Sequence, residues 1–190
     1  MNKKLLYLDL DNTIIETISG DTFPRWIGDL KFKDGFLPAL TNFVVETGVY
    51  YIWITSNQGG IEKGFVDAIH FRKKLEFVCA AVEDYCEHDE RIKERYGDVI
   101  QKKIQCDGVF APTNNPDDPM RKPHTGMLEV FFATGTHPNN IGKDEMIMIG
   151  DASGLEGQII RCDKDCAANY GIDYLDVNDF IDTYFTHYEV

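Results

Sequence analysis

The first feature of the sequence that restricts the fold is a short apolar run followed at once by two closely spaced aspartates. The run occupies residues 5–8, and Asp9 and Asp11 follow it in the order Asp-Leu-Asp-Asn-Thr. A short apolar run bounded by polar residues is typical of a buried strand. The two carboxylates would share one face of a strand, or one pocket if the chain bends after Asp9. Because like charges repel, the pair favours a bound cation or a shared proton, although aspartates are also common in ordinary turns.

The rest of the chain alternates between predicted strands and predicted helices. Further strands are expected over residues 50–54, 107–111, 145–149 and 174–177. Helices are expected over residues 36–47, 65–88 and 164–170, together with a short helix that ends at about residue 134 and a last helix that starts at residue 179. Residues 14–33 mix strand-forming and turn-forming residues, which predicts a small hairpin-like flap after the first strand. Residues 89–104 are expected to extend the second helix into solvent. This alternation predicts an α/β fold, with a mostly parallel sheet and helices on both faces.

The length and charge of the chain restrict its organisation and its partners. A chain of 190 residues suits a single domain, here 1–190, and the flap and one helix leave no room between residues 11 and 50 for a large cap domain. The formal net charge of −13 disfavours general attraction to nucleic acid or to an anionic membrane, although a local basic groove remains compatible with it. No apolar run approaches the roughly 18 residues of a membrane span, and no signal peptide is recognised, so a cytoplasmic protein is expected.

Other predicted strands are also followed by polar residues that suit a binding site. These residues are Ser56, Asn57, Arg121, Lys122 and Asp151. In open α/β sheets ligands bind beyond the carboxyl ends of the strands, so we expect these side chains and the two aspartates to meet at one rim. Taken singly, Ser56 is more typical of a helix cap, Lys122 of an exposed surface lysine, and Asp151 of a turn.

Four motifs, in this order along the chain, resemble the haloacid dehalogenase superfamily, most of whose members are magnesium-dependent phosphatases. The motifs are Asp9-Leu10-Asp11-Asn12-Thr13, Ser56-Asn57-Gln58, Lys122-Pro123 and Gly150-Asp151. The resemblance extends from residue 5 to about residue 180. It implies a Rossmann-like fold and the hydrolysis of a phosphomonoester through an aspartyl phosphate, in two chemical steps.

The resemblance also implies a role for each residue. Asp9 would attack phosphorus, and Asp11 would act first as the general acid and then as the general base. Ser56 and Lys122 would hold the phosphoryl group, with Asn12, Asn57 and Arg121 as further candidates for substrate contacts. The ligands of a Mg²⁺ ion would be Asp9, the backbone carbonyl of Asp11, and Asp151.

Two longer segments narrow the resemblance within the superfamily. They are Ser56-Asn57-Gln58-Gly59-Gly60-Ile61 and Arg121-Lys122-Pro123-His124-Thr125-Gly126-Met127, and they resemble histidinol-phosphate phosphatase, heptose-bisphosphate phosphatase and the phosphatase domain of polynucleotide kinase/phosphatase. The first two usually carry a zinc-binding loop before the Lys-Pro motif. Residues 106–120 contain one cysteine and no histidine, so no zinc site is expected here.

The segment after Gly150 resembles most the polynucleotide 3′-phosphatase domain, which implies a 3′-phosphorylated nucleic-acid end as the substrate. The Phe-Ser-x-x-Asp stretch usual in that family is reduced here to Asp163, which leaves Glu156 and Asp163 as candidates for a further acidic group beside the metal. Two alternatives remain: a phosphatase of a small phosphorylated metabolite, such as a sugar phosphate or histidinol phosphate, and a non-catalytic binding module. The presence of both Asp9 and Asp11 favours an enzyme.

Overall fold

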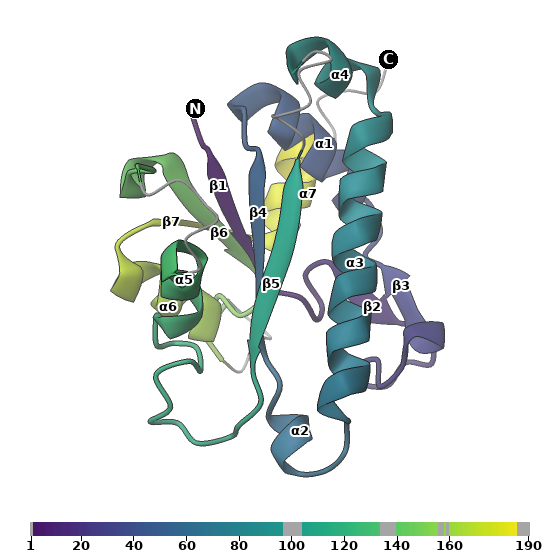
Figure 1. Cartoon of the computed structure of the whole chain (residues 1–190), viewed down its shortest axis with the longest axis vertical. Coiled ribbons are helices and arrows are strands. Elements are labelled where there is room, and N and C mark those ends of the chain that lie inside the picture. Colours follow the sequence, from purple (N-terminus) through teal and green to yellow (C-terminus); the bar gives the residue numbers. More distant parts are fainter. Residues whose placement is uncertain (1, 97–103, 134–139, 156–157, 159, 186–190) are drawn as a thin grey trace.

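A parallel five-stranded sheet forms the centre of the molecule (Figure 1). The computed structural model describes residues 2–96, 104–133, 140–155, 158 and 160–185. The strand order is β5-β4-β1-β6-β7, and the strands are β1 (Leu5–Leu8), β4 (Tyr51–Asn57), β5 (Gln105–Ala111), β6 (Met146–Gly150) and β7 (Asp173–Asp176). In the central register Leu8 pairs with Ile54 and Ile149, so that the carboxyl ends of the three middle strands lie at the same edge.

Helices cover both faces of this sheet. On one face pack α1 (Phe36–Thr47), α3 (Ala68–His88) and α7 (Val177–Phe185), and on the other pack α5 (Gly126–Ala133) and α6 (Cys162–Tyr170). The side chains of β1 alternate between the two cores, with Leu6 and Leu8 in the first core and Leu5 and Tyr7 in the second. A strand buried on both faces is apolar throughout, which is why β1 is a continuous apolar run. The predicted Rossmann-like α/β fold is confirmed.

Local signals in the sequence fix the ends of two helices. Helix α1 lies between Gly35 and Gly48, which adopt φ angles of 78° and 89° that glycine allows without steric cost. Helix α3 begins after Asp67, whose carboxylate accepts hydrogen bonds from the backbone N–H groups of Ile69 and His70.

The predicted flap after the first strand is a two-stranded antiparallel hairpin beside α3 (Figure 1). It contains β2 (Ile15–Thr17), the short 3-10 helix η1 (Ile27–Asp29) and β3 (Leu30–Phe32). Asp29 stabilises the flap through two hydrogen bonds within it. Its carboxylate accepts one bond from the backbone N–H of Ser19 at 2.8 Å and one from the Ser19 hydroxyl at 2.9 Å. The flap and α1 together fill the chain between β1 and β4, so the expected absence of a large cap there is confirmed within the described residues.

Several boundaries differ from the predictions. Strand β4 continues to Asn57, because it pairs with β5 along its whole length. The helix expected from residue 65 is preceded by a separate short helix, α2 (Gly59–Glu62), and starts at Ala68. Residues 89–104 do not simply extend α3, since Asp89 is extended and α4 (Glu90–Tyr96) is a new helix with Ile92 buried. The predicted extension over residues 97–103 lies outside the described residues.

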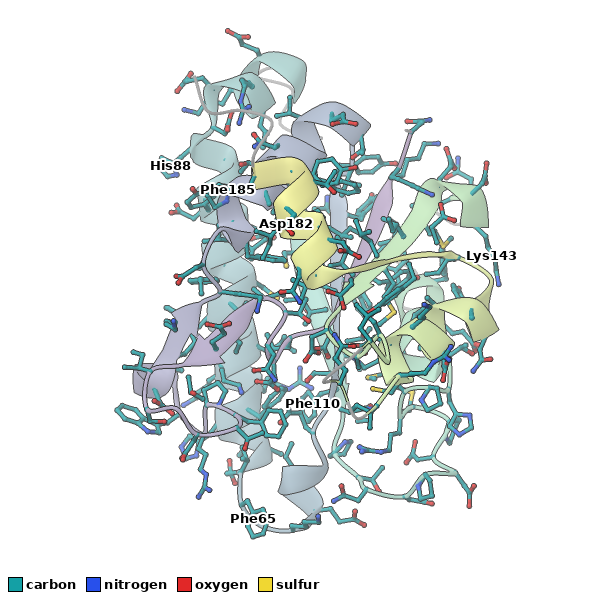
Figure 2. The ribbon with its side chains drawn as sticks, turned by 180° about the vertical axis from the view of Figure 1, so that it is seen from behind. Phe65, His88, Phe110, Lys143, Asp182 and Phe185 are labelled. Atoms are coloured by element: carbon teal, nitrogen blue, oxygen red, sulfur yellow. The ribbon has the colours of Figure 1, made fainter. Side chains whose placement is uncertain are left out.

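The middle strands of the sheet begin at one end of the molecule and finish at the other. The short 3-10 helix η2 (Lys143–Glu145) leads into β6 at the end where β1 begins, and Glu145 there pairs with Lys4. Figure 2 shows Phe65 at the opposite end from His88, so that α3 runs along most of the long axis. Phe65 marks the end at which the middle strands finish.

None of the described helices combines the length and the apolar character needed to cross a bilayer.

Candidate active site

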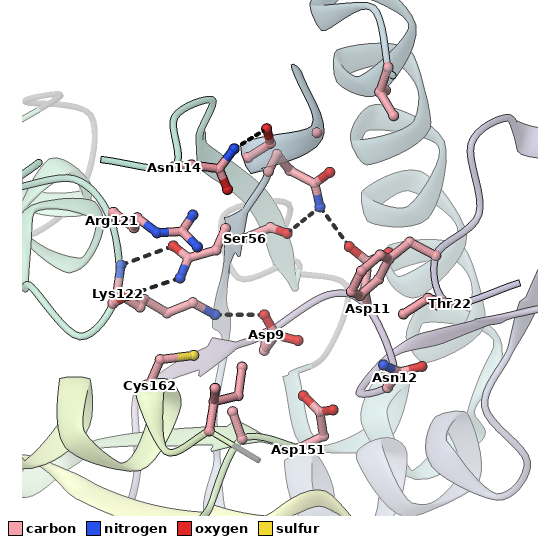
Figure 3. Close-up of a pocket in the computed structure, with 18 of the residues that line it drawn as sticks. Asp9, Asp11, Asn12, Thr22, Ser56, Asn114, Arg121, Lys122, Asp151 and Cys162 are labelled. Carbon is pink, nitrogen blue, oxygen red and sulfur yellow. Dashed lines mark hydrogen bonds and ion pairs between the residues drawn. The ribbon is translucent and has the colours of Figure 1, made fainter. Parts of the chain in front are cut away.

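A pocket of about 730 Å³ opens at the carboxyl ends of the middle strands. All eight site residues predicted from the sequence line it: Asp9, Asp11, Asn12, Ser56, Asn57, Arg121, Lys122 and Asp151. They come from four separate segments of the chain, and the parallel sheet brings them together. Figure 3 shows Asp9 near the middle of the site, with Lys122 on one side and Asp11 on the other.

The chain bends directly after β1, and this bend turns both aspartates into the pocket. The N–H of Asp9 still bonds to the carbonyl of Ile149 at 3.0 Å, as in the sheet. The N–H groups of Ile14 and Ile15 then both bond to the carbonyl of Leu10, which closes a tight turn. Within this turn Asn12 has a φ angle of 62°, a left-handed conformation that asparagine tolerates better than most residues. The bend after Asp9 that would place both carboxylates in one pocket is therefore present.

Lys122 is the central cation of the site. Its Nζ lies 2.6 Å from Asp9 Oδ1 and 2.7 Å from Asp163 Oδ1, and it donates a third bond to the carbonyl of Thr55 at 2.9 Å. These three bonds use all the N–H donors of the ammonium group. Burial by itself would lower the pKa of Lys122, but the charges of Asp163 and Asp9 raise it well above its usual value. The side chain of Lys122 is only 1% exposed, so this lysine is a fixed charge in the pocket wall.

Three carboxylates gather on this side of the pocket. One oxygen from each of Asp9, Asp151 and Asp163 lies within 4.8 Å of the others. Burial raises the pKa of Asp9 against the opposing effect of Lys122, and burial together with the charge of Asp163 raises the pKa of Asp151 to about 6. Mg²⁺ prefers oxygen ligands and is usually held by one or two carboxylates, so this donor set fits the ion. The cluster includes Asp9 and Asp151, the two side chains predicted as ligands.

Asp163 is one of the two residues that the sequence offers as a further acidic group beside the metal, and it lies in this cluster. Its Oδ2 accepts the backbone N–H of Ala152 at 3.1 Å, and its Oδ1 pairs with Lys122. A methyl group on Gly150 would come within 2.4 Å of Asp163 Oδ2, so a glycine is required for this close approach. Glu156, the other candidate, lies outside the described residues.

The carboxylate of Asp11 has partners of its own, away from this cluster. Gln58 Nε2 donates to Asp11 Oδ2 at 2.6 Å and to Ser56 Oγ at 2.8 Å (Figure 3). Lys74 Nζ, from the buried face of α3, lies 3.5 Å from Asp11 Oδ1. Neither Gln58 nor Lys74 was among the predicted site residues. Gln58 could have been found inside its motif, and Lys74 as a lysine on the apolar stripe of its helix.

Asn57 and Arg121 position the loop that carries Lys122. Both polar atoms of the Asn57 amide bond to the backbone of Lys122: Oδ1 accepts its N–H at 2.9 Å, and Nδ2 donates to its carbonyl at 3.0 Å. Arg121 Nη1 donates to the carbonyl of Thr113 at 2.8 Å. These bonds fix the loop of residues 112–122 against the end of β4.

The outer rim of the pocket combines aromatic and basic side chains. Phe23 and Arg25 come from the flap, and Lys63 and Phe65 from the loop between α2 and α3. Phe23 is 53% exposed and Phe65 is 67% exposed, which is unusual for large apolar rings. An exposed ring on the wall of a pocket offers a flat surface on which a planar group can stack.

The parallel sheet, the paired aspartates after β1, and the buried lysine together define a phosphatase of the haloacid dehalogenase type. The sequence model of the family described as polynucleotide kinase 3 phosphatase matches residues 4–181, and the chain belongs to this family. No curated protein matches the chain significantly in sequence.

Solved structures share the fold. A D,D-heptose 1,7-bisphosphate phosphatase from B. bronchiseptica, complexed with magnesium and phosphate, is similar with a TM-score of 0.61 and 17% identity, over 90% of this chain and 78% of that one. A putative haloacid dehalogenase-like phosphatase from Mesorhizobium loti is similar with a TM-score of 0.56 and 18% identity, over 97% of this chain and 87% of that one.

Proposed function

We propose that this phosphatase hydrolyses phosphomonoesters through an aspartyl phosphate on Asp9, with Mg²⁺, and that it acts on the 3′-phosphorylated end of a nucleic acid. The observation that carries the proposal is the contact between Asp9 and Lys122, at 2.6 Å, beside Asp11 in the same pocket. A nucleophile, a fixed cation and a proton donor are the groups that transfer of a phosphoryl group needs. A protein that only binds its ligand would have no need of the proton donor, Asp11.

In the first step Asp9 attacks phosphorus and the bond to the ester oxygen breaks. Lys122 orients the Asp9 carboxylate, and Thr13 Oγ1 donates to its other oxygen at 3.3 Å. Asp11 gives its proton to the departing ester oxygen, so that the leaving group departs as an alcohol. The Ser56 hydroxyl, bonded to Gln58 and lining the pocket, holds a phosphoryl oxygen together with Lys122.

In the second step a water molecule attacks the phosphorus of the aspartyl phosphate. Asp11 now accepts a proton from this water, and cleavage of the acyl phosphate bond regenerates Asp9 and releases inorganic phosphate. The same Asp11 therefore serves as acid and then as base, which suits a carboxylate that the fold holds in one place. Gln58 contributes by fixing Asp11 Oδ2 at 2.6 Å.

The carboxylates of Asp9 and Asp151 and the backbone carbonyl of Asp11 would hold Mg²⁺. When bound, the ion neutralises negative charge on the transferring phosphoryl group. Asp163 touches the same cluster but pairs directly with Lys122 at 2.7 Å, so we assign it the role of holding Lys122 in place.

The rim of the pocket supports the nucleic-acid end as substrate. Single-stranded nucleic acids are commonly bound by aromatic rings on which bases stack, together with cations along the backbone. Phe23 and Phe65 provide such rings, and Arg25 and Lys63 lie beside them in sequence and line the same pocket. These side chains can bind the last nucleotides of a strand despite the overall charge of −13.

The five cysteines, all present as free thiols, support a reducing cytoplasmic location.

A small phosphorylated metabolite is the second candidate. Residues 21–25 of the flap line one wall of the pocket, and a flap loop in this position could close over a small ester. In that case the aromatic rim would contribute little to substrate affinity.

A phosphate-release assay tests these proposals. Mg²⁺-dependent release is compared for a 3′-phosphorylated oligonucleotide, the same oligonucleotide phosphorylated at its 5′ end, a sugar phosphate and histidinol phosphate. We expect the 3′-phosphorylated oligonucleotide to have the highest kcat/KM. The Asp9→Asn variant should lose at least about 1000-fold in kcat on the best substrate, as expected when a nucleophile is removed.

Each outcome has a distinct meaning. Preference for either small ester would overturn the choice of substrate and leave the chemistry intact. Full turnover by Asp9→Asn would overturn the assignment of the nucleophile. Absence of turnover on every ester, with Mg²⁺ bound as measured by calorimetry, would favour the binding module.

A further inference from the structure

Helix α3 directs one cation into the interior of the protein. Its inward face is otherwise apolar and includes Phe71, Leu75 and Val78, yet Lys74 lies on the same face with 3% of its surface exposed. A buried ammonium group is costly unless it finds hydrogen-bond acceptors and a counter-charge. The reaction steps proposed above give Lys74 no role, so its presence in this position requires another explanation.

The contacts of Lys74 join the helix to two other parts of the molecule. Its Nζ donates to the carbonyl of Pro24 in the flap at 3.0 Å and lies 3.5 Å from Asp11 Oδ1. The ammonium group is also 4.7 Å from the centre of the Phe71 ring. Burial lowers the pKa of Lys74, while the charge of Asp11 opposes this effect.

With Lys74 included, both oxygens of Asp11 have a partner. Gln58 contacts Oδ2 from the end of β4, and Lys74 contacts Oδ1 from α3. A carboxylate held at one oxygen alone can still rotate about its terminal bond, whereas contacts at both oxygens select one orientation. The orientation matters because proton transfer requires the donor to lie within hydrogen-bond reach of the ester oxygen.

We propose that Lys74 is a positioning residue, which orients the carboxylate of Asp11 for proton transfer and ties it to the flap through the carbonyl of Pro24. This inference rests on the proposed role of Asp11 as acid and base. The neighbours of Pro24, from Asp21 to Arg25, line the pocket. A substrate that settles against the flap therefore also fixes the support of Asp11, and the proton donor is best placed when the pocket is filled.

The chemistry of the leaving group separates this role from a purely structural one. An alkyl ester such as a 3′-nucleotide releases a strongly basic alkoxide, which must be protonated as it leaves. An aryl ester such as p-nitrophenyl phosphate releases a stabilised phenolate, which can leave without a proton. Loss of a correctly oriented Asp11 should therefore slow the alkyl ester far more than the aryl ester.

The experiment compares Lys74→Met with Lys73→Met, which changes an exposed lysine on the same helix. Methionine keeps most of the length of the side chain and removes its charge and its donors. For Lys74→Met we expect kcat/KM to fall about 30-fold on a 3′-phosphorylated oligonucleotide and at most about threefold on p-nitrophenyl phosphate. Lys73→Met should change neither by more than about twofold. The ratio of the two rates is measured on one sample, so it does not depend on the fraction of the variant that is folded.

Equal losses on the two esters, or no loss on either, would overturn the proposal. A second measurement in the Asp11→Asn background tests the route of the effect. There Lys74→Met should leave the ratio of the two rates unchanged, and a further selective loss would show that Lys74 does not act through Asp11. Absence of turnover by the unchanged protein on both esters would instead overturn the proposed function, and with it this role.

Discussion

The two sides of the pocket are built in different ways. The Asp9 side consists of Asp9, Lys122, Asp151 and Asp163, and it rests on the ends of β1 and β6, the start of α6 and the loop clamped to β4. The Asp11 side consists of Asp11, Gln58, Lys74 and flap residues 21–25. On the first side, charges of opposite sign meet at 2.6 and 2.7 Å in the interior. On the second, long side chains bridge separate elements and the outer rim is exposed.

This difference indicates a division of labour. The Asp9 side provides attack and charge neutralisation, which every phosphomonoester requires in the same way. The Asp11 side and the rim meet the leaving group, which is the part of the substrate that varies. Changes on the Asp9 side should therefore affect all substrates alike, and changes near the rim should depend on the substrate. Four predictions test this comparison, from the largest effect to the smallest.

Replacement of Lys122 should have the largest effect. In Lys122→Met the carboxylates of Asp9 and Asp163 lose their shared cation, so kcat/KM should fall at least about 100-fold on alkyl and aryl esters alike. Without Mg²⁺ the free energy of unfolding should fall by about 3 kcal/mol, since one partner of a buried ion pair is removed. Phosphate release and urea unfolding measure the two effects. The exposed Lys164→Met serves as the control, and a strong preference of the loss for one ester would contradict the comparison.

Adding one methyl group should reduce stability more on the Asp9 side than at the rim. Gly150→Ala places a Cβ 2.4 Å from Asp163 Oδ2, which must move and disturb Lys122, so we expect a loss of about 2 kcal/mol in unfolding free energy. It should also lower kcat/KM about tenfold on every ester. Gly60→Ala is the matched control at the rim, because its Cβ meets nothing closer than 3.8 Å. Equal stability of the two variants in urea unfolding would show that the Asp9 side is not tightly packed.

Affinity for Mg²⁺ should depend on pH through Asp151. Its pKa is raised to about 6 by burial and by Asp163, and a carboxylate must be deprotonated to bind the ion. Below about pH 6 each unit of pH should therefore weaken Mg²⁺ binding up to about tenfold, as measured by calorimetry. A raised pKa also means that the folded protein holds this proton more tightly than the unfolded chain does. Without Mg²⁺, the contribution of Asp151 to stability accordingly falls as the pH rises towards 6.

The control for this titration is Asp151→Asn. It should bind Mg²⁺ weakly at every pH and show a smaller change between about pH 5 and 7. A wild-type affinity that stays constant through pH 6 would remove Asp151 from the set of ligands.

The smallest effect is expected at the aromatic rim. Phe65→Ala removes a ring that is 67% exposed, so the fold should lose little stability. If a base stacks on this ring, KM for a 3′-phosphorylated oligonucleotide should rise about fivefold, while kcat/KM for p-nitrophenyl phosphate stays unchanged. Phe77 is also exposed, but it lies on α3 and does not line the pocket, so Phe77→Ala should change neither KM for the oligonucleotide nor kcat/KM for p-nitrophenyl phosphate. An equal effect of Phe65→Ala on both esters would argue against stacking.

Much of the site could be predicted from the chain because its residues follow strands. Apolar runs identified the strands that became β1, β4 and β6, and the polar residues directly after them do line one pocket. Lys122, in a loop, was placed through its motif. Element boundaries were less accurate: α2 was missed, and β4 was predicted to end three residues early, because its final pairs with β5 are long-range contacts.

The residues that the sequence did not reveal are those whose role depends on contacts between distant elements. Lys74 belongs to the basic run 72–74 and lies at an apolar position of its helix, but its partners Asp11 and Pro24 come from other elements and appear only in the folded structure. The choice of Asp163 as the partner of Lys122 depends on the approach of α6 to Gly150. The sequence by itself determined which carboxylates would share a rim, because parallel strands finish at the same edge of a sheet. The tertiary structure alone decided that Gln58 and Lys74 would hold Asp11, because these contacts depend on how the helices and the flap pack on that edge.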